Sequence, residues 1–236
     1  MSLKVWRKVG TGAFGSVFHV RDRTTGNDIA LKQVHMNVGH KTAAALRELH
    51  VLQYLAHKSP HMLPMFGAHA NGGTLALIMP FVPITLAYVL AERPGPLTES
   101  EAACLGRMLL RGMAVVHRVG LLHRDVKPAN LLLARSGALL LADFGQARHK
   151  PLEVDGSLSH AVATRWYRAP ELLLGARRYG PGVDVWACGA VLAQLLTLSP
   201  LLPGESDIDQ LVCVRVIWPP SAPARVTAVH VHVGFA

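Results

Sequence analysis

Apolar and polar positions alternate over short stretches in the first third of the chain. This period of two predicts β-strands at residues 3–9, 16–21 and 29–34, separated by glycine-rich or Thr-Thr-Gly-Asn turns. Residues 74–79 form a further apolar strand, which ends at Pro80. The pattern therefore predicts a small antiparallel sheet.

Three longer segments have the spacing of helices instead. Residues 42–56 carry leucines at helical intervals and are expected to pack on the sheet. Thr98 and Glu101 match a capping box in front of a second, longer helix. Residues 184–196 are apolar enough for a buried helix. Short strands are expected at residues 121–123, 130–133 and 138–143.

The change from strand to helix patterns falls near residues 81–86 and predicts two lobes. We therefore expect an α+β fold in which residues 1–82 form an antiparallel sheet with one helix, and residues 83–211 form a mainly helical lobe. After Leu211 the pattern fails in a proline-rich segment. This predicts an incomplete second lobe and a divergent tail over residues 212–236.

Composition favours a folded chain. Half of the 236 residues are apolar and 17% are charged, which argues against disorder. No uncharged apolar run reaches the roughly 20 residues of a membrane span, and the N-terminus lacks a signal-peptide pattern. Three widely spaced cysteines offer no disulfide framework, so a location in the cytoplasm and/or nucleus is expected.

The formal net charge of +9 is compatible with an anionic partner such as nucleic acid, ATP or a phosphorylated segment. The basic residues are scattered and form no block of like charge, which argues against a nucleic-acid surface. The thirteen histidines show no zinc-site spacing. We expect neither nucleic acid nor a membrane as a partner.

A glycine motif lies between the first two predicted strands, in the sequence GTGAFGSV. Without a Cβ, glycine lets backbone N–H groups approach phosphates closely. The same spacing occurs in dinucleotide-binding folds, but a helix follows the motif there, whereas a strand follows it here. A simple turn is the other interpretation. The predicted phosphate-binding residues are Gly10, Thr11, Gly12, Ala13, Phe14, Gly15 and Ser16.

Lys32 lies on the third predicted strand, where it can contact the α- and β-phosphates of a nucleotide. Such a lysine needs a carboxylate to hold it. Glu48 is the only acidic residue between Asp28 and Glu92, and it shares a helical face with leucines expected to pack on the sheet. The sequence therefore predicts a Lys32–Glu48 pair; the alternative is an exposed lysine and a solvated glutamate.

The strongest chemical signal is HRDVKPAN, at residues 123–130. Phosphoryl transfer needs a base for the acceptor hydroxyl, a positive charge near the transferred group and oxygen ligands for Mg²⁺. Asp125, Lys127 and Asn130 have the residue types and spacing for these three roles. Asp143, in the Asp-Phe-Gly that follows, is expected to be the main Mg²⁺ ligand.

With these motifs and Ala-Pro-Glu at residues 169–171, residues 1–211 resemble a eukaryotic protein kinase domain. The segments VATRWYRAPELLLGARRYGPGVDVW and SPLLPGESDIDQL are most similar to the cell-cycle-related branch of the cyclin-dependent kinase family. The resemblance implies a two-lobed kinase fold, with ATP and Mg²⁺ as cofactors. It also implies proline-directed transfer of phosphate to serine or threonine of protein substrates, in a role related to the cell cycle.

Further site residues follow from the resemblance alone. The carbonyl of Pro80 and the amide of Val82 would be the hinge contacts to adenine, with Met79 as gatekeeper. Arg168 would shape the pocket for the proline of the substrate. The adenine pocket would be lined by Val9, Val17, Ala30 and Leu132.

The resemblance also implies a route of activation. Ser159 matches the activation-loop phosphosite of the family, and Ser157 is a competing site. The phosphate would be received by Arg47, Arg124 and Arg148, which come from three separate elements. The implied partners are a cyclin or other activator and an activating kinase.

The alternative interpretation is a binding protein. Every expected catalytic residue is present, which favours an enzyme. In the family, helices beyond the position of Leu211 carry an arginine that pairs with the glutamate matching Glu171. That family arginine has no match here, which favours a truncated, catalytically impaired form that acts as a scaffold.

Overall fold

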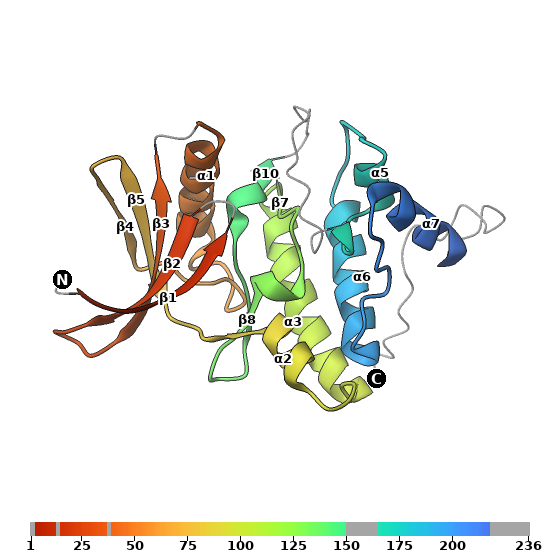
Figure 1. Ribbon diagram of the computed structural model, residues 1–236, viewed down its shortest axis with the longest axis horizontal. Helices are drawn as coiled ribbons and strands as arrows, with labels where there is room; N and C mark the ends of the chain where they lie inside the picture. Colours follow the sequence, from red (N-terminus) through yellow and green to blue (C-terminus); the bar gives the residue numbers. More distant parts are fainter. Residues whose placement is uncertain (1–2, 13–14, 37–38, 150–164, 218–236) are drawn as a thin grey trace. The chain divides into compact units, whose positions relative to one another are not determined.

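The computed structural model describes residues 3–12, 15–36, 39–149 and 165–217 (Figure 1). The chain divides into two compact units. The first contains residues 1–84 and 132–147, and the second contains residues 85–131 and 148–236. The α+β prediction, with a sheet and one helix first and a mainly helical part after them, is confirmed.

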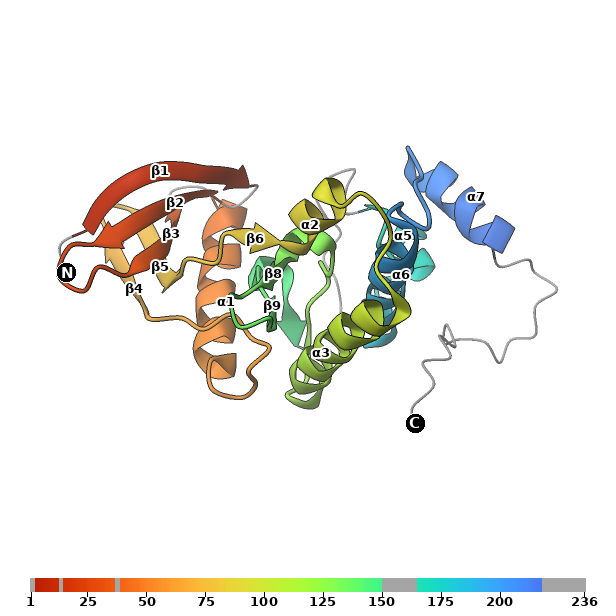
Figure 2. The same cartoon turned by 90° about the horizontal axis from the view of Figure 1, so that it is seen from below.

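An antiparallel sheet of five strands dominates the first unit (Figure 2). In spatial order the strands are β1 (Leu3–Gly12), β2 (Gly15–Asp22), β3 (Asp28–His35), β5 (Thr74–Pro80) and β4 (Gly67–Asn71). The sequence predicted four of these strands. It missed β4, whose residues GAHAN lack large apolar side chains and are mostly exposed, so no alternation marks it.

The helix α1 (Gly39–Leu55) lies beside this sheet (Figure 1). Of the four leucines whose spacing predicted a packed face, Leu52 and Leu55 are fully buried, whereas Leu46 near the start of the helix is exposed. The strands β8 (Leu131–Leu133) and β9 (Leu139–Leu141) and the 3₁₀ turn η2 (Phe144–Gln146) follow much later in the chain.

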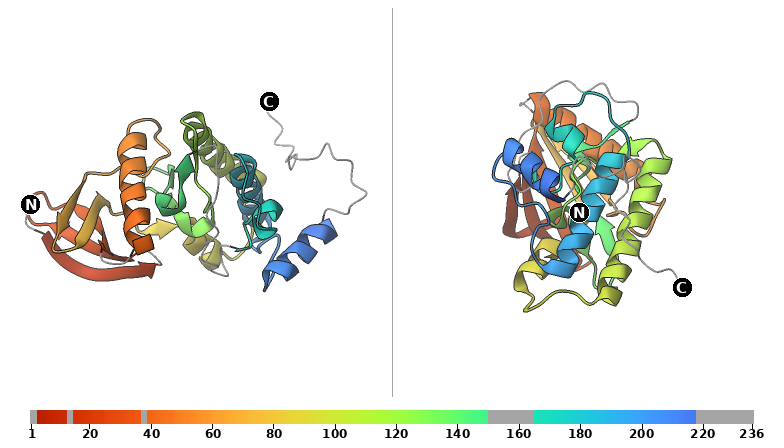
Figure 3. Two further views of the ribbon diagram at one scale, coloured as in Figure 1. Left: turned by 90° about the horizontal axis from the view of Figure 1, so that it is seen from above. Right: turned by 90° about the vertical axis from the view of Figure 1, so that its right-hand side faces the viewer.

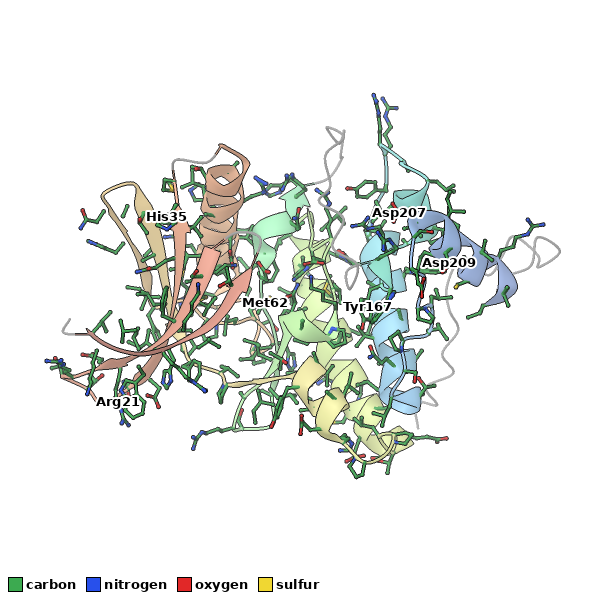
Figure 4. All side chains as sticks on the ribbon, viewed as in Figure 1. Arg21, His35, Met62, Tyr167, Asp207 and Asp209 are labelled. Atoms are coloured by element: carbon green, nitrogen blue, oxygen red, sulfur yellow. The ribbon has the colours of Figure 1, made fainter. Side chains whose placement is uncertain are left out.

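Residues 132–147 join the first unit, although the sequence interpretation had assigned them to the second lobe. Backbone hydrogen bonds explain this placement. The N–H of Leu141 donates to the carbonyl of His61, and the N–H of Leu63 donates to the carbonyl of Leu141. The buried Met62 between them, marked in Figure 4, forms a parallel bridge with Leu141.

Helices make up most of the second unit, and the longest of them pack together (Figure 3). Helices α3 and α6 approach so closely that a Cβ on Gly106 would lie 2.7 Å from Leu192. The helices are α2 (Leu86–Glu92), α3 (Glu99–Arg118), α5 (Pro170–Leu173), α6 (Gly182–Thr197) and α7 (Asp207–Ile217). Short elements complete the unit: β7 (Leu121–Leu122), the 3₁₀ turn η1 (Pro128–Asn130) and β10 (Arg148–His149), while β6 (Ile84–Thr85) spans the change between units.

The sequence interpretation did not predict α2, α5, α7 or β10 of the second unit. Helix α2 was not predicted, because its seven residues are too few for a helical period to stand out. Helix α7 continues through Leu211 as far as Ile217, so the first residues of the expected tail are helical. Across the described ranges, no helix combines the length and apolar character needed to cross a membrane.

The predicted capping box begins α3. The Thr98 hydroxyl accepts a hydrogen bond from the Glu101 N–H at 3.2 Å, and the Glu101 carboxylate accepts one from the Thr98 N–H at 2.8 Å. Both bonds satisfy donors that the first turn of a helix would otherwise leave without partners.

We predict that Thr98→Ala lowers the free energy of unfolding by about 1 kcal/mol, because one reciprocal cap is lost. Chemical denaturation measures this difference. Ser100→Ala, at an exposed position in the same turn, is the matched control and should leave the free energy unchanged within about 0.5 kcal/mol. Equal losses in both variants would contradict a role for the cap.

Candidate active site

The glycine motif forms the hairpin between β1 and β2. Gly10 faces Val17, Thr11 faces Ser16, and Gly12 faces Gly15 across the two strands. A Cβ on Gly15 would lie 2.1 Å from the carbonyl oxygen of Gln33, and the φ of Gly15 is 154°, so only glycine fits there. Two of the predicted phosphate-binding residues, Ala13 and Phe14, lie outside the described residues.

Three of the four predicted adenine-pocket residues lie on the adjacent strands β1, β2 and β3 of the first unit. Val17 pairs with Lys32, and Ala30 pairs with Met79, so these side chains share one face of the sheet. Val9 sits at an irregularity of the β1–β2 pairing and is 48% exposed. Leu132, on β8, is partly buried.

The segment predicted as the hinge follows β5. Pro80, at the end of that strand, pairs with Ile29, and Val82 comes two residues later. Between them, the Phe81 ring stacks on the His19 ring with centroids 3.9 Å apart. This contact was not predicted, because His19 is 62 positions away in the sequence and one histidine in a strand gives no signal.

Lys32 and Glu48 form the predicted buried pair. The Lys32 ammonium donates to both Glu48 carboxylate oxygens, at 2.8 and 2.6 Å, and Glu48 is only 2% exposed. The Lys32 ammonium also donates to the Asp143 carboxylate at 3.0 Å. A buried charge is tolerated only when it is paired, and here the Lys32 ammonium pairs with both carboxylates.

Asp143 lies at the beginning of η2 with a left-handed backbone, its φ being 60°. Burial by itself would lower the pKa of Lys32, but the charges of Glu48 and Asp143 outweigh it and raise this pKa. The lysine is therefore held as a cation, the form needed to bind phosphate.

The predicted catalytic residues come together on the loop after β7, in the second unit. One carboxylate oxygen of Asp125, Oδ2, accepts hydrogen bonds from the Lys127 ammonium at 2.8 Å and the Asn130 amide at 3.0 Å. The Asn130 amide also donates to the Asp125 backbone carbonyl at 2.8 Å. The other carboxylate oxygen, Oδ1, is buried and has no hydrogen-bond partner within the described ranges.

Asp184 of α6 organises this loop, and the sequence interpretation gave it no role. Its carboxylate accepts hydrogen bonds from the N–H groups of His123 and Arg124, at 2.9 and 2.7 Å, and contacts His117 Nε2 at 2.8 Å. The bond to Arg124 helps to hold its left-handed backbone, with φ of 70°. The available signal was a lone acidic residue in the apolar run of residues 184–196.

The pKa of the Asp184 carboxyl is lowered overall. Burial alone would raise it, but hydrogen bonds from His117 and from the backbone, together with the charge of His123, outweigh that effect. The group is 1% exposed and is therefore a buried carboxylate whose hydrogen bonds replace water.

Two of the predicted phosphate-receiving arginines belong to the second unit. The Arg124 guanidinium lies 5.7 Å from the Tyr179 ring, and its buried Nε and Nη1 have no hydrogen-bond partner in the part of the chain that the structure describes. Burial raises the pKa of Tyr179, and the charges of Arg124 and Arg148 oppose this effect. Arg47, on α1 of the first unit, donates to the carbonyl of Ala43 at 2.8 Å. The predicted phosphosite, Ser159, and its competitor, Ser157, lie outside the described residues.

Arg168 and Asp125 line one small cavity of the second unit, together with Tyr167. Arg168 is 8% exposed. Burial lowers its pKa, and the nearby carboxylates of Asp207 and Asp125 oppose that effect. The predicted proline-pocket arginine and the predicted base therefore share one cavity.

Known proteins match the sequence of this chain. A family model described as protein kinase domain matches residues 3–224. Cyclin-dependent kinase 20 of Danio rerio is 42% identical over 217 residues, which cover 91% of this chain and 63% of that protein. Cyclin-dependent kinase 7 of Xenopus laevis is 40% identical over 212 residues, 86% of this chain and 58% of that protein. The chain thus spans about three fifths of the length of these curated relatives.

We predict that Asp184→Asn lowers the free energy of unfolding by about 3 kcal/mol at neutral pH, because an amide cannot accept all three hydrogen bonds. The folded pKa of Asp184 lies below the ordinary 3.8, so its charge stabilises the fold fully above pH 3.8. This contribution is lost as the pH falls through the lower folded pKa. The difference between wild type and variant should therefore shrink in acid.

Urea denaturation of wild type and Asp184→Asn at a series of pH values measures this difference. Asp209→Asn, a partly exposed aspartate on α7, serves as the control for the loss of one negative charge. A difference that stays constant or grows below pH 3.8 would contradict the assigned role of the carboxylate.

Proposed function

The chain belongs to the protein kinase domain family, and we propose that it transfers the γ-phosphate of ATP to serine or threonine side chains of proteins. The observation that carries this proposal is the asymmetric Asp125 carboxylate. Lys127 and Asn130 hold one oxygen, whereas Oδ1 has no partner among the described residues. A general base needs such an oxygen, fixed in position and free to accept a proton.

In the proposed reaction, Asp125 Oδ1 accepts a hydrogen bond from the substrate hydroxyl and takes its proton as the hydroxyl oxygen attacks the γ-phosphorus. The O–H bond breaks and a new O–P bond forms. The bond from the γ-phosphorus to the bridging oxygen breaks, and ADP leaves with that electron pair. Lys127, whose ammonium contacts the Asp125 carboxylate, supplies positive charge beside the transferred phosphoryl group.

The proposed role of Lys32 is to hold the α- and β-phosphates. Its position on β3 and the carboxylates of Glu48 and Asp143 support this role, because they keep it charged and fix its direction. The glycine hairpin of β1 and β2 would supply backbone N–H groups to the same phosphates.

We propose that Mg²⁺ binds together with the nucleotide, since each unit offers one side chain of a suitable type. Asp143 offers a carboxylate, and Asn130 uses its amide nitrogen for hydrogen bonds to Asp125, which leaves its amide oxygen for a cation. Such oxygen ligands are those that Mg²⁺ prefers. When bound, the ion neutralises phosphate charge during transfer.

The choice of substrate and partners extends the proposal. Arg168 shares a cavity with Asp125, which supports recognition of proline directly after the acceptor residue. The relatives are named cyclin-dependent kinases. We therefore propose that a cyclin or other activator and an activating kinase are partners of this chain. We also propose a role related to the cell cycle, in the cytoplasm and/or nucleus.

A second candidate function is that of a catalytically impaired scaffold. It would use the same Lys32 ammonium, held by Glu48 and Asp143, to bind Mg-ATP without transferring phosphate. The two functions differ in a single observable, phosphate transfer by a protein that binds Mg-ATP.

We predict that Asp125→Asn abolishes phosphate transfer and leaves Mg-ATP binding unchanged, because Asp125 acts on the acceptor hydroxyl. Lys32→Met should weaken Mg-ATP binding as well as transfer. Transfer is measured with a Ser-Pro peptide, and binding by calorimetry and by the ligand-induced rise in melting temperature.

The control is Glu99→Gln, an exposed residue in the first turn of α3, which should change neither quantity. Equal transfer by wild type and Asp125→Asn would disprove the proposed base. A wild-type chain that binds Mg-ATP but transfers no phosphate under any activating condition would favour the scaffold.

We also predict that phosphorylation of Ser159 activates the chain. A phosphate carries about −1.5 to −2 charges and would bring Arg47, Arg124 and Arg148 together through charge-assisted hydrogen bonds. Ser159→Ala should prevent activation by an activating kinase, and Ser157→Ala should not, when turnover of a Ser-Pro peptide is measured. Loss of activation in Ser157→Ala alone would assign the site to Ser157 instead.

A further inference from the structure

Three consecutive side chains before Arg168 are each anchored at a different point of the second unit. Arg165 donates through Nε to the Asp207 carboxylate at 2.6 Å and through Nη1 to the Glu205 carbonyl at 3.0 Å. Trp166 donates through its indole N–H to the Gly204 carbonyl at 3.2 Å. Tyr167 donates to the Gln194 side chain of α6 at 2.6 Å. Two of the three anchors therefore lie in residues 204–207.

Residues 204–207 are themselves held firmly. The Gly204 N–H donates to the side-chain oxygen of Gln210, which is fully buried, and a Cβ on Gly204 would lie 2.5 Å from the Gln210 backbone. The Glu205 N–H donates to the Asp209 carboxylate at 2.9 Å. Helix α7 begins at Asp207. Figure 4 marks Asp207, Asp209 and Tyr167.

Charge makes Asp207 different from the other anchors. Arg165 and Arg168 are 9% and 8% exposed, and each adds to the electrostatic cost of burying the other. Asp207 forms the ion pair with Arg165, and its charge also acts on Arg168. One carboxylate of α7 thus pairs directly with Arg165 and, together with Asp125, favours the charged form of Arg168.

We propose that Asp207 is a positioning residue for the substrate-binding segment, residues 165–169. By holding Arg165 directly and compensating Arg168, it keeps the proline-pocket arginine in its place beside Asp125. This inference rests on the proposed function, because it assigns part of the peptide selectivity of that same site. It predicts that α7, which holds none of the catalytic residues, contributes to the choice of peptide.

The test compares Asp207→Asn with wild type in steady-state transfer to two peptides, one with proline and one with alanine after the acceptor serine. The variant should raise KM for the proline peptide about tenfold, the size expected from loss of one charged hydrogen bond. It should also reduce the preference for proline and leave KM for ATP unchanged. Asp207→Glu should restore part of the preference, since it keeps the charge.

Asp209→Asn is the matched control, since it removes a negative charge two positions away on α7 while the asparagine amide oxygen can still accept the Glu205 N–H and the backbone N–H can still donate to Ser206. It should leave both peptide values unchanged. An unchanged proline preference in Asp207→Asn, an equal rise of KM for ATP, or the same effect in Asp209→Asn would overturn the inference. If Asp207→Asn does not fold, the double variant Arg165→Gln, Asp207→Asn removes both charges together. The KM values for the two peptides and for ATP then test the inference in that variant.

Amide hydrogen exchange separates this inference from the proposed function. Exchange of residues 165–169 should be faster in Asp207→Asn than in wild type and in Asp209→Asn. If wild type transfers no phosphate, the proposed function fails, and faster exchange in Asp207→Asn alone still supports the anchoring role. Unchanged exchange overturns that role whatever the activity.

Discussion

The buried carboxylate of Asp184 is the interaction on which the catalytic loop depends. A carboxylate taken out of water must recover its hydrogen bonds from the protein, and here two backbone N–H groups and the His117 ring supply them. The same bonds fix His123 and Arg124, which lie directly before Asp125. The hydrogen bonds that replace water around Asp184 therefore also fix the position of the proposed base, Asp125.

The same constraint recurs at the other buried charges. Glu48 is acceptable in the interior of the first unit because Lys32 donates to both of its oxygens. Arg165 is acceptable because Asp207 and a backbone carbonyl receive its guanidinium. In each case the pairing that makes burial possible also directs a group proposed to act in the reaction. Electrostatic compensation and functional geometry are thus one requirement in this fold.

The sequence predicted what is encoded locally or by elimination. The capping box of α3 is readable from Thr98 and Glu101, and the partner of Lys32 follows because Glu48 has no acidic rival nearby. The sequence could not predict the bonds of Asp184 or Asp207, which join residues 42 to 67 positions apart. Such contacts depend on how packed elements meet, and neither periodicity nor spacing reports this. The return of residues 132–147 to the first unit was missed for the same reason.

Three residues other than glycine have a left-handed backbone: Arg124, Asp143 and Leu198 within the described ranges. Each such residue costs about 1 kcal/mol relative to a relaxed conformation. Two of them flank or carry the proposed chemistry, whereas Leu198 only ends α6. Glycine at any of the three positions would thus relieve backbone strain and raise thermal stability. Only at Leu198 would this gain in stability leave the proposed activity unchanged. At Arg124 and Asp143, glycine would raise stability but remove a side chain proposed to act in the reaction or in its activation. Selection for activity therefore keeps a residue with a strained backbone at both positions.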